Sequence, residues 1–111
     1  MPDSNNGLIR VMVDTLVREA DPDAVILFGS HARGDAGDDS DVDLLIVERE
    51  PFGPQRSRRK ETARLYLAIR KLAIAKDLLV YSREEFDRFK NSAHHIIGRV
   101  QREGKVLHER A

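Results

Sequence analysis

Three short runs of mostly branched or aromatic apolar residues restrict the fold of this chain more than any other feature. They cover residues 24–28, 42–47 and 78–81. Each run is too short for a typical helix, and residues that favour turns lie close to its ends. Continuous apolar runs of this length are typical of strands that are buried on both faces of a sheet. We therefore predict a sheet built around three buried strands.

The segment before the first run has the spacing of an amphipathic helix. Residues 4–6 offer side chains that could cap its start. Asp21-Pro22-Asp23 should end it, because proline supplies no amide hydrogen and clashes with a continuing helical turn. The apolar side chains recur at steps of three and four residues, at Ile9, Met12, Val13, Leu16 and Ala20.

Two further helices are predicted around the third run. Ser82 with Glu85 three residues later has the form of a capping box and predicts a short helix. Helical spacing also covers residues 62–73, which places a helix between the second and third runs. We interpret the apolar stripe of this helix as ordinary core packing, formed by Leu65, Tyr66, Ile69 and Leu72.

The order of the elements predicts the fold class. A last helical pattern covers residues 93–100, and a short tail at residues 105–107 could add an edge strand. The full order is helix, strand, turn, strand, helix, strand, helix, helix. This alternation predicts an α/β (α+β) fold with a small, mostly buried sheet. We expect residues 1–111 to form one domain with a shallow cleft, because two separate cores would each be too small to be stable.

Composition excludes several classes of protein. Lys plus Arg and Asp plus Glu each number 19, so no net charge would attract nucleic acid over a distance. The chain has no Cys, which excludes disulfides and thiolate metal sites and fits a reducing compartment. No apolar run approaches the roughly 20 residues of a membrane helix, and the first seven residues lack the features of a signal peptide. We expect a cytoplasmic protein that does not bind membranes.

Three aspartates form a candidate metal site. Asp41 and Asp43 lie two residues apart at the start of a predicted strand, so their carboxylates should point to the same side. Their mutual repulsion would be relieved by a divalent cation, and oxygen ligands suit Mg²⁺ or Mn²⁺. Asp77 begins the third run and would complete the site if the second and third strands are neighbours. Three carboxylates can hold the two ions used in many in-line phosphoryl transfers.

A candidate phosphate-binding turn precedes these aspartates. Gly29 and Ser30 follow the first predicted strand, where backbone amides are free to point at an anion. Gly29 allows close approach to a phosphate because it has no Cβ. Ser30 adds a hydroxyl donor, and Arg33 adds a guanidinium group that can bind phosphate oxygens in a bidentate manner.

These residues together resemble the signature of the minimal nucleotidyltransferases, which are small members of the DNA polymerase β-like superfamily. The family pattern is Gly-Ser, a spacer of about ten residues, Asp-x-Asp on a strand, and a third Asp on a neighbouring strand. Here LFGSHARG at residues 27–34 and SDVDL at residues 40–44 match the first two parts. Asp77 in KDLLV matches the third, and EGKVL at residues 103–107 extends the resemblance across nearly the whole chain.

The resemblance implies a nucleotidyltransferase fold in which helices flank a small mixed sheet. It also implies ATP as the nucleotide donor and Mg²⁺, with two ions expected. The catalytic and metal-binding residues would be Asp41, Asp43 and Asp77, and the nucleotide-binding residues would be Gly29, Ser30, Arg33 and Gly34.

The resemblance further implies a protein partner. Minimal nucleotidyltransferases are often paired with a helical HEPN toxin, and in such pairs they can act as antitoxins that adenylylate a tyrosine of the toxin. Other relatives modify small molecules such as aminoglycosides, usually with an additional domain, so the short chain favours a protein acceptor. A non-catalytic antitoxin that only binds its toxin is a third hypothesis. The acceptor, the nucleobase and the state of homo- or hetero-oligomerisation are left open.

Several polar residues have simpler interpretations. His31 is read as an exposed loop residue rather than a phosphate ligand, and His94 and His95 as helix-surface residues. The basic cluster at residues 56–60 is read as a solvated helix start, which leaves a role in nucleic-acid binding as a weaker alternative. An Asp-x-Asp pair alone is also typical of solvated turns, and three further acidic residues are assigned to a solvated loop, namely Asp35, Asp38 and Asp39.

Overall fold

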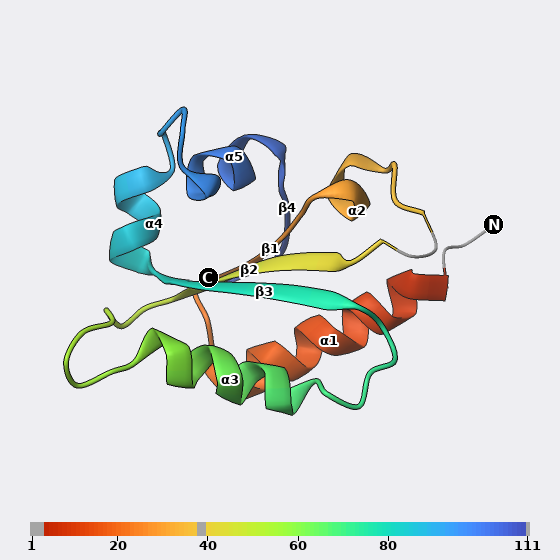
Figure 1. The fold of residues 1–111 in the computed structure, drawn as a ribbon, viewed down its shortest axis with the longest axis horizontal. Coiled ribbons are helices and arrows are strands. Elements are labelled where there is room, and N and C mark those ends of the chain that lie inside the picture. Colours follow the sequence, from red (N-terminus) through yellow and green to blue (C-terminus); the bar gives the residue numbers. More distant parts are fainter. Residues whose placement is uncertain (1–3, 38–39, 111) are drawn as a thin grey trace.

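Four strands form one mixed β-sheet in the computed structural model, which describes residues 4–37 and 40–110 (Figure 1). They lie in the order β3-β2-β1-β4. Strand β1 is antiparallel to both of its neighbours, whereas β2 and β3 are parallel. This arrangement confirms the predicted fold class, and β4 is the predicted edge strand. The strands are β1 (Ala24–Phe28), β2 (Val42–Glu48), β3 (Lys76–Ser82) and β4 (Lys105–Glu109).

Helices cover both faces of this sheet. Helices α1 (Ser4–Ala20) and α3 (Arg58–Ala68) lie on one face, and α4 (Arg83–Phe89) and α5 (Ile96–Glu103) lie on the other (Figure 1). The short helix α2 (Ser30–Arg33) follows β1 directly. In the described part of the chain, none of these helices has the length and apolar character needed to cross a bilayer.

The two helical layers explain why the apolar runs are continuous. Along β2 the side chains alternate between the two faces of the sheet. Leu44 and Ile46 belong to the core formed with α1 and α3, whereas Leu45 and Val47 belong to the core formed with α4 and α5. All four side chains are buried. A central strand covered on both sides must be apolar at every position except where it leaves the core.

Two local sequence signals mark the boundaries of elements as predicted. Helix α1 ends at Ala20, and Asp21 then adopts a positive φ of 45° before the buried Pro22. At the end of β3, Ser82 accepts a hydrogen bond from the amide of Glu85, and the Glu85 carboxylate accepts one from the amide of Ser82. This is the predicted capping box, which satisfies two backbone donors at the start of α4.

Three predicted boundaries are wrong. Helix α3 ends at Ala68, so Leu72 lies outside it in a chain of tighter turns where each amide bonds a carbonyl only two or three residues earlier. The Lys76 ammonium group stabilises these turns by donating to the carbonyls of Leu72 and Ile74. Helix α5 starts at Ile96 rather than near residue 93. Part of the predicted turn after Gly29 is helical, in α2.

Candidate active site

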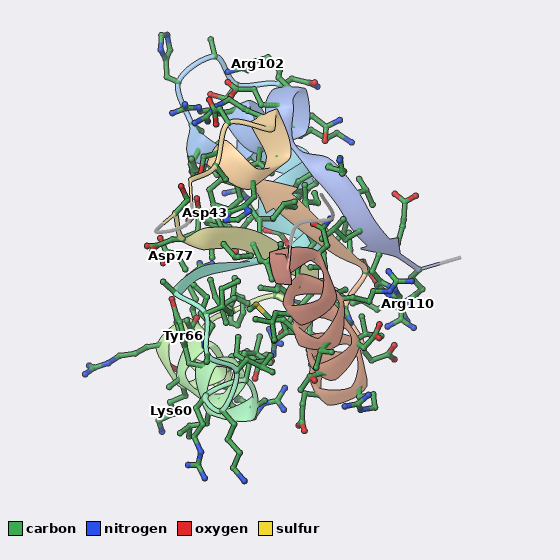
Figure 2. All side chains as sticks on the ribbon, turned by 90° about the vertical axis from the view of Figure 1, so that its right-hand side faces the viewer. Asp43, Lys60, Tyr66, Asp77, Arg102 and Arg110 are labelled. Carbon is green, nitrogen blue, oxygen red and sulfur yellow. The ribbon has the colours of Figure 1, made fainter. Side chains whose placement is uncertain are left out.

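The parallel pairing of β2 and β3 brings two of the predicted site residues together. Asp43 is the register partner of Asp77, so both carboxylates lie at the same level of the sheet. They lie on the face covered by α4 and α5, because they alternate with residues of the opposite core. Figure 2 shows Asp43 and Asp77 next to each other at one end of the sheet. Asp41 lies two residues before Asp43, on the segment that leads into β2.

Negative charge at this position is not neutralised by basic side chains. Within residues 4–37 and 40–110, no Lys or Arg forms an ion pair with Asp41, Asp43 or Asp77, although most described carboxylates elsewhere have such a partner. Burial raises the pKa of Asp43, and the charges of Asp77 and Asp41 raise it further. His31 and Arg33 act in the opposite direction. The site therefore concentrates charge that a bound cation would offset.

The carboxylate oxygens are the donor type that Mg²⁺ prefers. As the side chains stand, no group of three acidic or histidine residues among those described is close enough to enclose an ion. The register brings together Asp43 and Asp77, whereas Asp41 is exposed just outside the strand. Convergence of all three carboxylates on one ion stays a prediction.

Gly29 contacts the carboxylate site directly. Its backbone has φ 73° and ψ −155°, a conformation that is essentially restricted to glycine. A Cβ added to Gly29 would overlap Oδ2 of Asp43 and would lie 3.2 Å from its Cγ. The end of β1 therefore lies so close to the carboxylate of β2 that any side chain at residue 29 would displace Asp43.

The rest of the predicted anion-binding turn is folded around α2. Gly34 ends this helix in the left-handed conformation with φ 82°, and its amide bonds the carbonyl of Ser30. The exposed guanidinium group of Arg33 lies 3.3 Å from Oδ2 of Asp35, so Arg33 already has a carboxylate partner. Asp35 is exposed, as predicted, whereas Asp38 and Asp39 lie outside the described residues.

His31 is half-buried rather than exposed, which corrects the prediction. Its Nε2 atom lies 3.2 Å from the carbonyl oxygen of Ser40, the residue before Asp41. This hydrogen bond joins α2 to the segment that enters β2. His31 therefore links the glycine turn to the aspartates.

A cleft beside Asp43 offers space for a ligand. It has a volume of about 180 Å³ and opens between the end of β1 and helix α5. A larger hollow of about 260 Å³ lies between α1, α2 and β4, but no acidic residue lines it. The cleft beside Asp43 is the candidate nucleotide site because, unlike this hollow and another of about 370 Å³ beside α1, it is lined by Gly29 and Asp43. It is lined by Phe28, Gly29, Asp43, Ile96, Arg99, Val100 and Glu103.

Two residues near the site have no sequence signal. Arg99 lines the cleft and pairs with Glu103, with Nε 3.3 Å from Oε2. Tyr66 packs against the core as predicted, but its hydroxyl group lies 3.2 Å from Oδ1 of Asp77. The pair formed by Arg99 and Glu103 has the i,i+4 spacing of a helix. The position of Arg99 at the cleft and the contact of Tyr66 with Asp77 depend instead on how helices pack against the sheet, so no local pattern predicts them.

His95 stabilises the fold. His95 is the N-cap of α5, where Nδ1 accepts a hydrogen bond from the amide of Ile97. Its ring is half-buried and stacks on Phe89 with 4.1 Å between centroids, so the prediction of a surface residue is wrong for His95. His94 is exposed.

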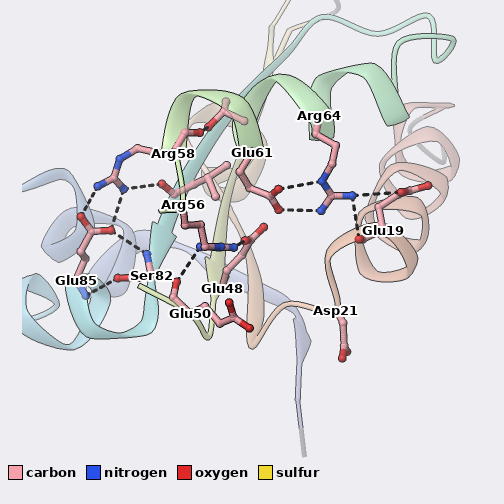
Figure 3. Close-up of polar contacts among 12 residues, drawn as sticks. Glu19, Asp21, Glu48, Glu50, Arg56, Arg58, Glu61, Arg64, Ser82 and Glu85 are labelled. Carbon is pink, nitrogen blue, oxygen red and sulfur yellow. Dashed lines mark hydrogen bonds and ion pairs between the residues drawn. The ribbon is translucent and has the colours of Figure 1, made fainter. Parts of the chain in front are cut away.

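The basic cluster at residues 56–60 is partly neutralised by carboxylates, as Figure 3 shows. Arg56 forms an ion pair with Glu48, and Arg58 forms one with Glu85. Arg59 and Lys60 are exposed at the start of α3. The prediction of a fully solvated helix start is therefore wrong for the two paired arginines.

Glu48 in this network makes stability depend on pH. Its side chain is only 4% exposed, and burial together with the neighbouring Glu61 raises its pKa from 4.5 to about 7, although Arg56 opposes the shift. A raised pKa in the folded state stabilises the fold at low pH, and this stabilisation is lost as pH rises towards 7.

Glu48→Gln should remove this dependence. From pH 5 to pH 8, the free energy of unfolding of the variant should rise relative to the parent by about 2 kcal/mol, because the raised pKa costs the parent roughly that much. Denaturant titration at both pH values measures the difference. Glu84→Gln removes an exposed carboxylate paired with Arg88, and the difference between its free energy of unfolding and that of the parent should be the same at both pH values. A constant difference for Glu48→Gln would contradict the prediction.

A family model and two solved structures match most of this chain. A family model described as "Nucleotidyltransferase domain" matches residues 9–107. The crystal structure of a provisionally named nucleotidyltransferase from Sulfolobus solfataricus is similar, with a TM-score of 0.60 and 26% identity over 94% of this chain and 79% of that one. A crystal structure of a toxin–antitoxin with AMP-PNP has the same fold, with a TM-score of 0.52 and 20% identity over 90% of this chain and 73% of that one.

One curated relative matches over a shorter stretch. The chain is 64% identical over 28 residues to a provisionally named protein adenylyltransferase from Methanocaldococcus jannaschii. This match covers 25% of the present chain and spans 28% of the relative's length. The family match, in contrast, spans every strand of the sheet up to residue 107 and includes the glycine turn and all three aspartates. The chain therefore belongs to the nucleotidyltransferase domain family.

Proposed function

We propose that this chain uses Mg²⁺ to transfer a nucleoside monophosphate from a bound nucleoside triphosphate to an acceptor hydroxyl. The observation that carries the proposal is the β2–β3 register, which aligns the carboxylates of Asp43 and Asp77 on one sheet face. Gly29 lies against Asp43 in a conformation restricted to glycine. Together they join the candidate anion-binding turn to a carboxylate pair, the combination that phosphoryl transfer requires.

Asp41, Asp43 and Asp77 would hold the cation in this proposal. When bound there, the divalent ions would neutralise charge on the transferring phosphoryl group and on the leaving pyrophosphate. The acceptor oxygen forms a bond to the α-phosphorus, and the bond from that phosphorus to the bridging oxygen of pyrophosphate breaks. We assign the acceptor's proton to Asp77, because this exposed carboxylate lies on the outermost strand of the site.

The nucleotide would extend from the glycine turn into the cleft beside α5. Phe28, Ile96 and Val100 supply apolar walls for the nucleoside, while Asp43 and Gly29 line the same cleft. Gly29, Ser30, Arg33 and Gly34 would contact the phosphates. Arg33 would then exchange its partner Asp35 for a phosphate oxygen, which costs little because the pair is exposed.

We infer that the donor is ATP and the acceptor a tyrosine hydroxyl on a HEPN toxin. A relative named as a protein adenylyltransferase and a structure of the same fold described as a toxin–antitoxin with AMP-PNP, an ATP analogue, support this assignment. The small cleft also favours an acceptor that brings its own surface. The chain would then act as an antitoxin by covalent modification of its partner.

The proposal is tested by incubating the chain with ATP labelled at the α-phosphate, Mg²⁺ and a HEPN protein. We expect label on a tyrosine of the partner, no label when a chelator removes Mg²⁺, and competition by unlabelled ATP. Transfer to an aminoglycoside in the absence of any protein would replace the protein acceptor with a small molecule. Neutralisation of the toxin by an Asp41→Asn, Asp43→Asn, Asp77→Asn variant would overturn the catalytic mechanism in favour of simple binding.

A further inference from the structure

Tyr66 makes two hydrogen bonds at the edge of the candidate site. Its hydroxyl group accepts a hydrogen bond of 2.8 Å from the amide of Leu78 and lies 3.2 Å from Oδ1 of Asp77. Because a phenol has a single proton and the amide uses an acceptor position, the proton of Tyr66 is free to be donated to Asp77. The hydroxyl therefore has one defined orientation between the backbone and the carboxylate.

The origin of Tyr66 makes this contact specific. The residue lies on α3, which covers the opposite face of the sheet from Asp77, and its ring packs against the core on that side. Its hydroxyl reaches Asp77 at β3, which is one of the two edge strands of the sheet. Figure 2 shows Tyr66 below the pair formed by Asp77 and Asp43. A phenylalanine would fill the same core space, so the hydroxyl is needed only for the edge contact.

Asp77 has no other polar partner to orient it among the described residues. Its neighbour Lys76 donates instead to the carbonyls of Leu72 and Ile74. An exposed Asp side chain that is not held would sample several rotamers. Tyr66 restricts it by binding Oδ1, which leaves Oδ2 available.

We infer that Tyr66 is a positioning residue that holds the Asp77 carboxylate in the orientation needed to bind a divalent cation. The inference rests on the proposed function, because it assigns Asp77 to the cation site. Tyr66 itself contacts neither cation nor substrate in this role. Loss of a side chain that orients a metal ligand typically weakens metal binding by about 10- to 100-fold.

The test compares Tyr66→Phe with the parent in three measurements. Calorimetric titration with Mn²⁺ should show at least about tenfold weaker binding. Hydrogen exchange followed by NMR should show faster exchange of the Leu78 amide, because its acceptor is gone. Steady-state kinetics should show a lower kcat with an unchanged KM for ATP, because the nucleotide cleft is not altered. Thermal unfolding without metal should show a small loss of stability, because the Leu78 amide loses its acceptor.

Two further variants separate positioning from a general packing effect. Tyr81→Phe makes the same chemical change on β3, where the Tyr81 ring contacts Arg58 and His95 rather than the aspartates, and should bind Mn²⁺ as the parent does. In an Asp77→Asn background, Tyr66→Phe should change Mn²⁺ affinity less than about twofold, because the group it orients is already lost.

The outcomes distinguish this inference from the proposed function. If the parent binds neither Mn²⁺ nor ATP, the proposed function fails, and the exchange of the Leu78 amide still reports the Tyr66 contact. If the parent binds Mn²⁺ and Tyr66→Phe binds it equally well, the positioning role alone is overturned. Intact-protein mass spectrometry adds a third arm. A nucleotide attached to Tyr66 of the parent would make this hydroxyl an acceptor and would also overturn the positioning role.

Discussion

Asp43→Asn is expected to lower the rate of nucleotide transfer by at least about a thousandfold without unfolding the protein. Asn keeps the shape of the side chain but removes the charge that would hold the cation. Asp43 is the residue to replace first, because it lies between Asp77, its register partner on β3, and the glycine turn at Gly29. A fixed-time assay with labelled ATP measures the loss.

The stability of Asp43→Asn should move in the opposite direction from its activity. Burial and the charges of Asp77 and Asp41 raise the pKa of Asp43 in the folded protein. A group with a raised pKa stabilises the fold at low pH and loses this contribution as pH rises, so the ionised carboxylate is unfavourable at neutral pH. Without added metal, the variant should therefore be at least as stable as the parent at pH 7 to 8. Thermal unfolding with and without Mg²⁺ measures this.

Asp87→Asn is the matched control for this experiment. Asp87 is exposed on α4 and pairs with Arg83 and Lys90, so the substitution removes the same charge outside the site. It should keep parental activity and lose little stability. An active Asp43→Asn variant, or one that loses activity only because it unfolds, would remove the basis for the carboxylate mechanism.

Predictions from local pattern succeeded where local interactions decide the structure. Strand β2 could be identified from its continuous apolar run. Both of its faces are buried, so almost every position must be apolar. The capping box at Ser82 needs only residues that are three apart, and it is present as predicted. Asp43 lies on β2 as predicted, whereas Asp41 lies just before the strand, so the placement of both carboxylates on one side stays a prediction.

Predictions failed where a distant part of the chain decides the outcome. Helical spacing continues beyond Ala68, but the chain must turn early to bring β3 beside β2, and Lys76 holds that turn through two carbonyls. His31 was predicted to be exposed because nothing in the local sequence indicates its bond to Ser40. Tyr66 has the spacing of a core residue, and its ring does pack in the core. Its hydroxyl, however, contacts Asp77 on β3, and the helical pattern does not indicate which strand lies beside the helix.

The site illustrates the same limit. Asp77 lies beside Asp43 because β2 and β3 are parallel neighbours. The spacing of residues within either strand does not reveal this pairing. The resemblance to the minimal nucleotidyltransferases supplied that expectation, and the register agrees with it. Arg99, which faces the cleft from α5, lies outside the motif and could be found only from the packing of that helix.

Gly29→Ala should combine a loss of about 2 to 3 kcal/mol in stability with a roughly hundredfold loss of transfer activity. The backbone conformation at Gly29 is strained for any residue with a Cβ, and the new methyl group would overlap the Asp43 carboxylate. The carboxylate would have to rotate away, and displacement of a reacting group by about 1 Å can reduce a rate about hundredfold. Denaturant titration and the labelled-ATP assay measure the two effects.

Gly34→Ala separates backbone strain from the collision. Gly34 also has a positive φ, of 82°, but no atom lies within 4 Å of the position of its Cβ. This variant should therefore lose only about 1 kcal/mol, the cost of the left-handed conformation. Ser82→Ala, which removes the capping box far from the aspartates, should lose a similar amount and keep its activity, so a loss of about 1 kcal/mol in stability should not by itself abolish transfer.

The double variant Gly29→Ala, Asp43→Ala isolates the contact itself. With the carboxylate removed, the nearest remaining atom of residue 43 is its Cβ, at 3.5 Å, which is ordinary van der Waals distance. Gly29→Ala should then cost less in the Asp43→Ala background than in the parent, because only the backbone strain remains. Activity should stay lost, because the carboxylate is absent. If Gly29→Ala lost the same stability in both backgrounds, glycine would be required at residue 29 only for its backbone conformation. That result would contradict the direct contact between the anion-binding turn and the carboxylate of Asp43.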